Sequence, residues 1–269
     1  MSLPSLLELA DSGAHFGHHR SLVAPQARPY IYSVNNHVAL INLEKTLENL
    51  SIARQVIKEA RDQGKTVLLV GTRRSLRRSV EEIAKKLELP YINDRWLGGF
   101  LTNFPQMLDN IARLEDLERE LDEKGSKLSK SDRLRLSARI DRAKRFLESV
   151  RSLKALPDLI VLASATEDKI VLKEAKQVQV PVVAICDTDV NPNLVDYPIP
   201  ANDDAPKAVK LILEALFSVT TTATPKKSSS SETAASKPKA KTEKKSTKPK
   251  AAKKVPKKVA SKKTQKDEN

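Results

Sequence analysis

Cysteine is almost absent from this 269-residue chain, which contains only Cys186. A single cysteine cannot form an internal disulfide, and its apolar neighbours in VVAIC predict a buried thiol, as expected in a reducing compartment. No apolar stretch approaches the roughly 20 residues that a membrane-spanning helix needs. The N-terminal segment MSLPSLLELADSG contains no basic residue, which argues against a secretory signal or a transit peptide. We therefore expect a cytoplasmic protein with no membrane partner.

Apolar and aromatic residues are also scarce, at 39% and 4% of the chain. The shortage is greatest in residues 226–269, which contain 16 lysines, no arginine and 4 acidic residues. These residues carry most of the formal charge of +14 and leave only +2 for residues 1–225. Such a composition cannot bury enough apolar surface to offset the entropy of ordering, so 220–269 is predicted to be a disordered basic tail. Its charge predicts an acidic partner, of which nucleic acid and an anionic surface are the commonest. The tail contains two lysine pairs that are candidates for this contact, Lys244 with Lys245 and Lys253 with Lys254.

Short apolar runs alternate with amphipathic helical patterns along most of the chain. The clearest strand is KTVLLVG at 65–71, which is continuously apolar. Further strands are predicted at 30–33, 37–43, 90–92, 158–163 and 181–186. Helices are predicted at 5–11, 42–63, 167–177 and 206–217, with another that Thr72 can cap. This alternation is typical of an α/β fold with a doubly wound, flavodoxin- or Rossmann-like parallel sheet flanked by helices.

Residues 104–156 interrupt this alternation. Apolar residues recur there at steps of mostly three and four in two runs, 107–121 and 136–150, with Gly125, Ser126 and Ser129 between them. The pattern predicts an inserted antiparallel coiled-coil hairpin. Its 13 basic and 10 acidic residues over 102–156 predict a solvated surface. The expected domains are an α/β body of 1–103 plus 157–219, the hairpin of 104–156 and the tail of 220–269.

Four arginines follow the strand of 65–71, in the predicted first turns of a helix: Arg73, Arg74, Arg77 and Arg78. Positive side chains oppose the helix dipole there, at a cost of about 0.3–1 kcal/mol each, which favours a bound anion. The carboxyl ends of parallel strands are also where open α/β sheets bind ligands, and arginine forks suit phosphate. The alternative is a solvated face paired with Glu81 and Glu82. The stretch VLLVGTRRS lacks the glycine pattern of dinucleotide sites and P-loops, so no nucleotide cofactor is predicted.

The segment DRWLGGFLTNF at 94–104 connects the predicted body to the hairpin and contains the only tryptophan. Gly98 and Gly99 permit a sharp turn, and Thr102 or Asn103 can cap the helix that follows. Trp96 is predicted to pack between the base of the hairpin and the body. Arg95 beside it is then left free at the surface.

Histidines and aspartates form the other candidate groups. His15, His18 and His19 could ligate zinc, but no cysteine or acid stands at a usual ligand spacing, so structural or RNA-contacting roles are favoured and no metal is predicted. Asp187 and Asp189 follow the predicted strand of 181–186. Asp203 and Asp204 precede the predicted helix of 206–217. Such pairs can hold Mg²⁺ or act in acid–base chemistry. No histidine or lysine is patterned beside them, so loop and capping roles are favoured over catalysis.

Eight stretches together resemble the small-subunit ribosomal protein S2 family of bacterial type. They are GAHFGH (13–18), RPYIY (28–32), INLEKT (41–46), VLLVGT (67–72), RWLGGFLTNF (95–104), LPDLIVL (156–162), VPVVAICDTDVNP (180–192) and DYPIPANDDA (196–205). The resemblance covers about residues 5–218. It implies a structural constituent of the small ribosomal subunit that is not an enzyme and has neither a cofactor nor a small-molecule substrate. It also implies binding to ribosomal RNA at the head–body junction and support for recruiting the mRNA-binding ribosomal protein S1.

Under this resemblance, the arginine cluster, Arg95 and His18 are expected to contact rRNA phosphates, which position a protein more than they specify sequence. The tail lysines should add a salt-sensitive contribution to binding. Two other classes follow from the residues alone. A nucleotide-binding enzyme would hold a small ligand at the turn of 71–75, and a DNA-compacting protein would act through the tail without the body.

Overall fold

A parallel five-stranded sheet forms the centre of the computed structural model, which describes residues 3–124 and 128–218. The strand order is β5-β4-β6-β7-β8, and each pair of neighbours is parallel. The strands are β4 (Val67–Val70), β5 (Tyr91–Ile92), β6 (Leu159–Leu162), β7 (Val182–Cys186) and β8 (Tyr197–Pro200). Every residue of β4, β6 and β7 is buried, as the continuous apolar runs predict for strands covered on both faces.

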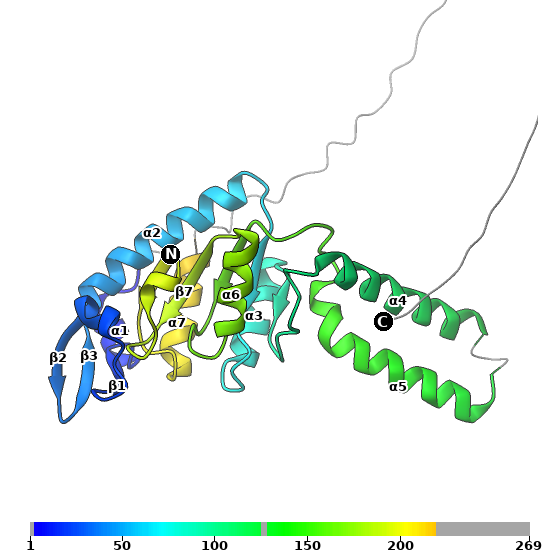
Figure 1. Cartoon of the computed structure of the whole chain (residues 1–269), viewed down its shortest axis with the longest axis horizontal. Helices are drawn as coiled ribbons and strands as arrows, with labels where there is room; N and C mark the ends of the chain where they lie inside the picture. Colours follow the sequence, from blue (N-terminus) through cyan, green and yellow to red (C-terminus); the bar gives the residue numbers. More distant parts are fainter. Residues whose placement is uncertain (1–2, 125–127, 219–269) are drawn as a thin grey trace, which may run out of the picture. The chain divides into compact units, whose positions relative to one another are not determined.

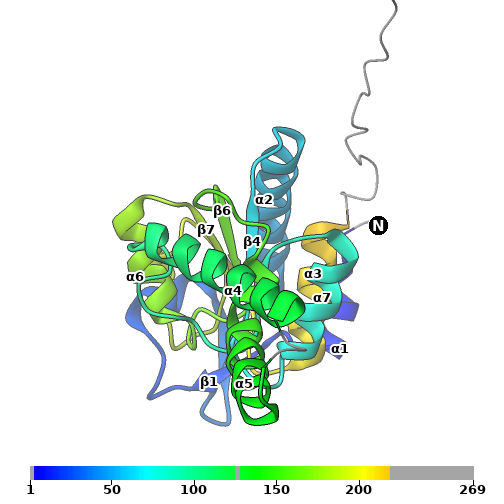
Figure 2. The same cartoon turned by 90° about the vertical axis from the view of Figure 1, so that its right-hand side faces the viewer.

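Alternate residues of each strand face two separate cores. On one face, Leu69, Val161 and Ile185 pack in a core with four helices. These helices are α1 (Leu6–Asp11), α2 (Leu43–Asp62), α3 (Arg77–Leu87) and α7 (Pro206–Phe217). On the other face, Leu68 and Ile160 share a core with α6 (Lys169–Val178). Figure 2 shows α6 on one side of the central strands and α3 and α7 on the other. The expected doubly wound parallel sheet is therefore confirmed.

A second, antiparallel sheet of three strands lies near the N-terminus, in the order β1-β3-β2. It consists of β1 (Phe16–His19), β2 (Ile31–Asn35) and β3 (Val38–Ile41), and a 3-10 turn, η1 (Pro25–Tyr30), precedes β2. Asn36 and His37 connect β2 to β3 with φ angles of 47° and 66°, the left-handed conformation that two-residue hairpin turns require. The sequence suggests a loop where β1 forms, because FGHH lacks the alternation of apolar and polar residues typical of a strand.

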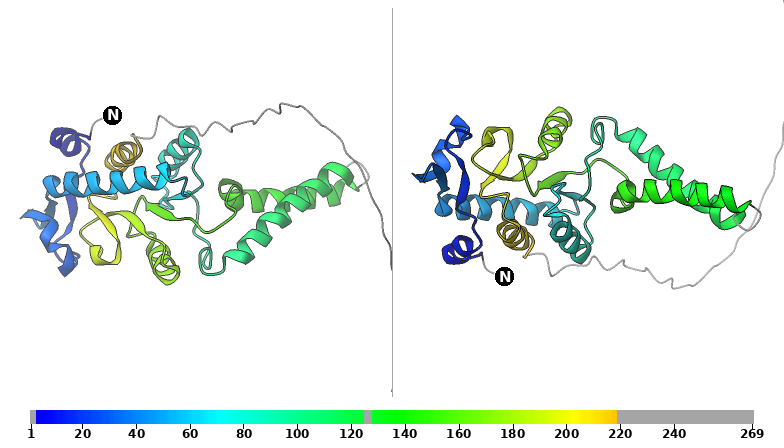
Figure 3. Two further views of the ribbon diagram at one scale, coloured as in Figure 1. Left: turned by 90° about the horizontal axis from the view of Figure 1, so that it is seen from above. Right: turned by 90° about the horizontal axis from the view of Figure 1, so that it is seen from below.

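Two paired helices form the insert, α4 (Phe104–Lys124) and α5 (Lys130–Leu147), followed by the 3-10 turn η2 (Glu148–Val150). Figures 1 and 3 show them side by side. Buried side chains of α4 (Met107, Ile111) and α5 (Ile140, Leu147) belong to the same core as the α6 face of the sheet. The hairpin therefore packs on the body through apolar side chains at its base.

The edge strand β8 follows a short 3-10 turn, η3 (Pro192–Leu194), and among the described strands it pairs only with β7. It contains Pro198 and Pro200, which cannot donate to a ladder and are tolerated at a sheet edge. Among the helices of 3–124 and 128–218, none combines the length and the apolar character needed to cross a bilayer. The predicted disordered tail of 220–269 lies outside the described residues.

Candidate nucleic-acid interface

The predicted arginine cluster lies where the chain leaves β4 and enters α3. The helix begins at Arg77, with Leu76 as its N-cap and no capping side chain, so it starts later than the predicted cap at Thr72. Thr72 instead donates a hydrogen bond from its hydroxyl to Asp168 Oδ1, at 2.8 Å. Arg73 therefore precedes the helix, whereas Arg77 and Arg78 occupy its first turn, where the helix dipole favours an anion.

Gly71 allows α3 to lie close to the end of β4. A Cβ atom at this position would come within 2.7 Å of Val80 Cγ2 and 2.9 Å of Ala163 Cβ, closer than any real side chain could be placed. The glycine in VLLVG thus permits tight helix–strand packing. That packing fixes where the following arginines emerge from the body.

Arg73 points into the body and meets acidic side chains. Only 15% of its side chain is exposed. It donates to the backbone carbonyl of Asp203 at 3.1 Å and forms an ion pair with Asp204, while Glu167 lies 3.7 Å away. Burial works to lower the pKa of Arg73, but the charges of Asp203 and Asp204 raise it above its usual value. This guanidinium neutralises carboxylates of its own chain and is poorly placed to meet a phosphate.

The other predicted arginines face outward. Arg77 contacts the carboxylate of Asp94 at 2.6 Å and keeps 43% of its side chain exposed. Arg78 is 92% exposed and pairs with Glu82 at 3.0 Å, an ion pair of the surface type that contributes only about 0–1 kcal/mol. Arg74 and Arg95 are exposed, and neither forms an ion pair within the described part of the chain. We call Arg74, Arg78 and Arg95 the body set.

His18 lies beside the acidic residues rather than beside the other histidines. Its Nδ1 is 3.1 Å from Asp187 Oδ1, and its Nε2 is 3.5 Å from Asp204 Oδ2. Burial works to lower the pKa of His18, but the hydrogen bond and charge of Asp187, with the charges of Asp189 and Asp204, raise it above its ordinary value. A protonated His18 therefore helps to balance this acidic group.

The carboxyl edge of the sheet gathers several buried carboxyl groups. Burial raises the pKa of Asp168 and of Asp203 to about 6 each, although Thr72 and Ser164 donate hydrogen bonds to them. Burial also raises the pKa of Asp187. By spacing, two groups could hold a metal ion: His18 with Asp187 and Asp189, and Asp187 with Asp203 and Asp204. Arg73 already supplies positive charge here, and His18 adds to it when protonated, which is the electrostatic role that a cation would play.

The remaining histidines have other neighbours. The His15 ring lies 4.0 Å from the Phe16 ring, and the His19 ring stacks on His37 at 5.7 Å. His19 Nδ1 is also 2.8 Å from the Ser21 hydroxyl. The structure therefore does not bring the three clustered histidines of the sequence onto one common site.

Glu174 of α6 holds the junction segment in place, which sequence reasoning missed. Its carboxylate accepts hydrogen bonds from Trp96 Nε1 at 3.1 Å, from the Gly99 amide at 2.8 Å and from the Leu101 amide at 3.0 Å. Only 8% of Glu174 is exposed. One feature of the sequence could have identified Glu174. It lies three residues after Val171, on the apolar side of the helix, and a carboxylate buried there needs hydrogen-bond donors.

The predicted junction residues occupy different environments. Trp96 is buried in the core of the α6 face, and its ring lies 4.9 Å from that of Phe100. Gly99 has φ +87°, a conformation that favours glycine, whereas Gly98 has open space around it. Asn103 immediately precedes α4, and its amide donates to the Gly99 carbonyl at 2.8 Å. Trp96 thus contacts the same core as the base of the hairpin and the sheet.

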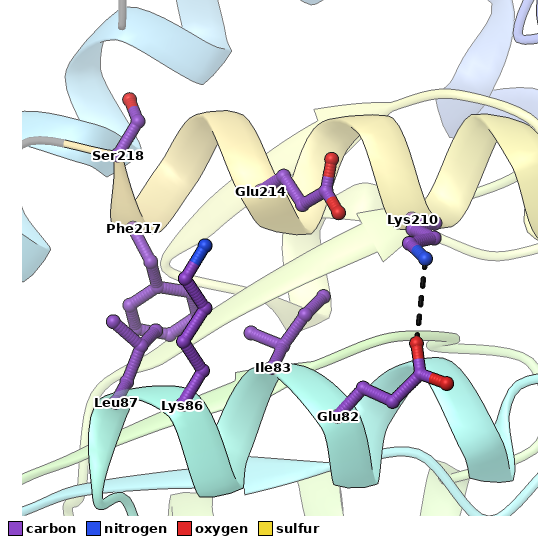
Figure 4. Close-up of a pocket in the computed structure, with 8 residues that line it drawn as sticks. All are labelled: Glu82, Ile83, Lys86, Leu87, Lys210, Glu214, Phe217 and Ser218. Atoms are coloured by element: carbon purple, nitrogen blue, oxygen red, sulfur yellow. Dashed lines mark hydrogen bonds and ion pairs between the residues drawn. The ribbon is translucent and has the colours of Figure 1, made fainter.

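A hollow of about 320 Å³ lies between α3 and α7. Ile83, Leu87 and Phe217 line its floor, and Glu82 pairs with Lys210 across it at 3.4 Å (Figure 4). Its rim carries both signs of charge, and it lies along the later turns of α3. It is therefore separate from the 71–75 turn at which a nucleotide would be expected.

Exposed apolar side chains gather on the N-terminal elements. Six of the eleven large apolar residues that are exposed within 3–124 and 128–218 lie before residue 35: Leu6, Leu7, Phe16, Leu22, Tyr32 and Val34. Leu6, Leu7 and Tyr32 also line one open hollow. We call Leu6, Leu7 and Tyr32 the N-terminal apolar face. The predicted tail contacts, Lys244, Lys245, Lys253 and Lys254, lie outside the described residues.

Comparison with known proteins gives consistent matches. The family described as Ribosomal protein S2 matches residues 9–223. Small ribosomal subunit protein uS2 of Coprothermobacter proteolyticus is 38% identical over 214 residues, 79% of this chain and 80% of that protein. The protein of the same name from Thermus thermophilus is 39% identical over 211 residues, 77% of this chain and 81% of that protein. That from Agrobacterium fabrum is 38% identical over 213 residues, 78% of this chain and 84% of that protein.

Proposed function

This chain belongs to the ribosomal protein S2 family, so it is a structural, non-enzymatic component of the small ribosomal subunit, and we propose that it binds ribosomal RNA through the body set. As a member of this family it takes part in translation in the cytoplasmic ribosome. The proposed RNA contact lies at the head–body junction of the subunit. Basic side chains there position the protein on phosphates, and base reading is slight.

The observation that carries this proposal is the exposure of Arg74 and Arg78 at the start of α3, and of Arg95, whose chain neighbour Asp94 pairs with Arg77 of that helix. Arg74 and Arg95 form no ion pair within the described residues, and Arg78 can exchange its surface partner Glu82 for a phosphate at little cost. Arg77 lies among them and keeps part of its side chain accessible. Like charges on one surface destabilise the free protein, so a bound polyanion is a natural partner.

Arg73 and His18 have an indirect role in this proposal. Both engage the buried carboxylates at the carboxyl edge of the sheet, and Arg73 approaches three acidic residues. They keep this edge from presenting uncompensated negative charge beside an RNA. The tail lysines, including Lys244, Lys245, Lys253 and Lys254, would add a salt-sensitive contribution that depends on charge alone.

We further propose that the N-terminal apolar face supports recruitment of a neighbouring ribosomal protein, the mRNA-binding protein S1. Tyr32 and Leu7 are 76% and 70% exposed, and exposed apolar patches commonly mark protein-binding surfaces. An amphipathic aromatic residue such as Tyr32 is typical of such contacts. Replacing Leu7 and Tyr32 by Ser should release S1 from purified small subunits while the chain itself remains bound. Retention of S1 by this variant would contradict the assignment.

The RNA contact is tested by rebinding of the full-length chain to small subunits that lack it. The variant carries Arg74→Glu, Arg78→Glu and Arg95→Glu, and the control carries the same charge change at exposed Lys58, Lys65 and Lys207. Affinity is measured over a range of salt concentrations. The slope of log affinity against log salt should decrease by about 1 for each arginine contact removed, and less for the control. Equal slopes for the two variants would contradict the proposal.

A further inference from the structure

The two helices of the hairpin carry opposite charge. Helix α4 contains three basic and seven acidic residues, whereas α5 contains seven basic and two acidic residues. The acidic residues of the insert are therefore concentrated on α4 and the basic residues on α5. A solvated hairpin has no need of this separation, because alternating charges along each helix would stabilise it better.

Three arginines of α5 lie along one side of the helix, at spacings of four and three residues: Arg135, Arg139 and Arg142. We call them the α5 stripe. All three are exposed, and none forms an ion pair within residues 3–124 and 128–218. Their neighbours Leu136, Ile140 and Ala143 pack in the hairpin core, so the stripe lies beside the contact between α4 and α5.

Other basic residues of this region are already engaged. Lys144 lies 2.8 Å from Glu118 of α4, and Arg151 lies 3.0 Å from both Glu115 and Glu118. These pairs use acidic side chains of α4 that face α5. The α5 stripe is therefore a surplus of positive charge rather than one half of the ion pairs that join the helices.

The stripe continues toward the body set. Arg145, one turn beyond Arg142, lies 4.0 Å from Asp94, and the same carboxylate contacts Arg77 at 2.6 Å. Arg95 follows Asp94 directly in the chain. Asp94 thus connects the start of α3 to the C-terminal part of α5. Basic side chains of α3 and α5 therefore lie close together around this carboxylate.

We propose that the α5 stripe binds the phosphate backbone of RNA and extends the surface formed by the body set, an inference that rests on the function proposed above. From Arg135 to Arg145 the helix rises about 15 Å, long enough to follow several phosphates of one strand. The outer side of α4, with Asp109, Asp116 and Glu123, repels the same backbone. The hairpin therefore meets RNA with α5 and turns α4 away from it.

Contact-range photo-cross-linking tests this orientation in assembled small subunits. A cysteine that carries an aryl azide is placed beside the stripe (Ala138→Cys), on the outer side of α4 (Ala112→Cys) or within the body surface (Ser75→Cys). All three positions are exposed. The native Cys186 is only 4% exposed and does not compete for the reagent. Each variant is the full-length chain, and its incorporation into subunits is verified before irradiation.

We expect cross-links to ribosomal RNA from positions 138 and 75, with a several-fold lower yield from position 112. RNA cross-links from position 75 alone would overturn the α5 proposal and leave the function of the body set intact. Equal yields from 138 and 112 would also overturn it, because the hairpin would then have no preferred side. Cross-links from position 138 without position 75 would support the α5 proposal and contradict RNA binding by the body set. Cross-links from none of the three positions would contradict both proposals.

A charge variant provides a second readout. The changes Arg135→Glu, Arg139→Glu and Arg142→Glu are compared with the same changes on α4, at Arg113, Arg119 and Lys124. In rebinding assays, the α5 variant should lower the slope of log affinity against log salt by about 3, and the α4 variant by less. Equal slopes for the two variants would contradict the proposal even if both proteins fold normally.

Discussion

Replacing Glu174 by alanine should destabilise the protein by about 3–5 kcal/mol. The carboxylate accepts three hydrogen bonds, from the indole of Trp96 and the amides of Gly99 and Leu101, at 2.8–3.1 Å. A hydrogen bond to a charged group contributes about 1.5–3 kcal/mol to the stability of the fold. The protein loses that contribution for each buried donor that is left unpaired. The sum is an upper limit, because water can reach part of the vacated space. The expected loss is still large for a single substitution.

Two milder variants divide this effect. Glu174→Gln keeps the volume of the side chain but has only one oxygen, so at least one of the three donors meets an NH₂ group, and we expect a loss of about 1–3 kcal/mol. Trp96→Phe removes one donor and retains an aromatic ring in the core. Because the two side chains interact directly, the double variant should lose less than the sum of the single losses, with a coupling of at least about 0.5 kcal/mol.

Urea unfolding followed by far-ultraviolet circular dichroism measures these differences, since the Trp96 variant lacks the only fluorescent indole. Lys173→Ala is the matched control, because Lys173 is the exposed neighbour of Glu174 on α6 and should change stability by less than about 0.5 kcal/mol. The reasoning is refuted if Glu174→Ala and Lys173→Ala unfold at the same urea concentration. Glu174 would then be a tolerated acid and not the residue that fixes the junction.

Further predictions concern the acidic edge and the tail. Arg73→Ala should lower the free energy of unfolding by about 3 kcal/mol, because it leaves Asp203 without its buried counter-charge, whereas Arg74→Ala should change it by less than about 0.5 kcal/mol in the same urea assay. The folded protein binds the proton of Asp168 more tightly than the unfolded chain, with a pKa of about 6 instead of 3.8, so this group's contribution to stability should fall by about 1 kcal/mol from pH 5 to pH 7. Asp168→Asn should flatten that part of the stability curve, and an unchanged curve would contradict the assignment. Deletion of 226–269 should reduce the salt slope of RNA binding without changing the midpoint of unfolding.

The parallel sheet could be predicted because each of its central strands is recognisable from a short stretch of sequence. Each of β4, β6 and β7 is a short, continuously apolar run, and the next element after β4 and after β6 is an amphipathic helix. The edge strand β8 escapes this reasoning, since YPIP contains two prolines and forms a strand only because β7 supplies its hydrogen-bonding partner. Strand β1 escapes it for a similar reason, because FGHH depends on pairing with β3.

The candidate site was harder to predict because long-range contacts decide which charges remain available. The sequence places Arg73 and Arg74 side by side with the same chemistry. In the fold, Arg73 meets Asp203 and Asp204, which lie some 130 residues later in the chain, and Arg74 faces solvent. Glu174 likewise acquires its role only when α6 packs against the junction segment. Local patterns identified the arginine-rich turn. Tertiary contacts then determine which of its arginines pair with carboxylates of the body and which remain accessible to a ligand.

Arginine modification in assembled small subunits tests the central claim most directly. Phenylglyoxal reacts with accessible guanidinium groups, and mass spectrometry quantifies the reaction at each arginine in the free chain and in the subunit. We predict that Arg74, Arg78 and Arg95 react in the free chain and are protected in the subunit, while Arg113 on α4 remains reactive in both. Equal reactivity of the body set in the free and assembled states would contradict its binding to ribosomal RNA.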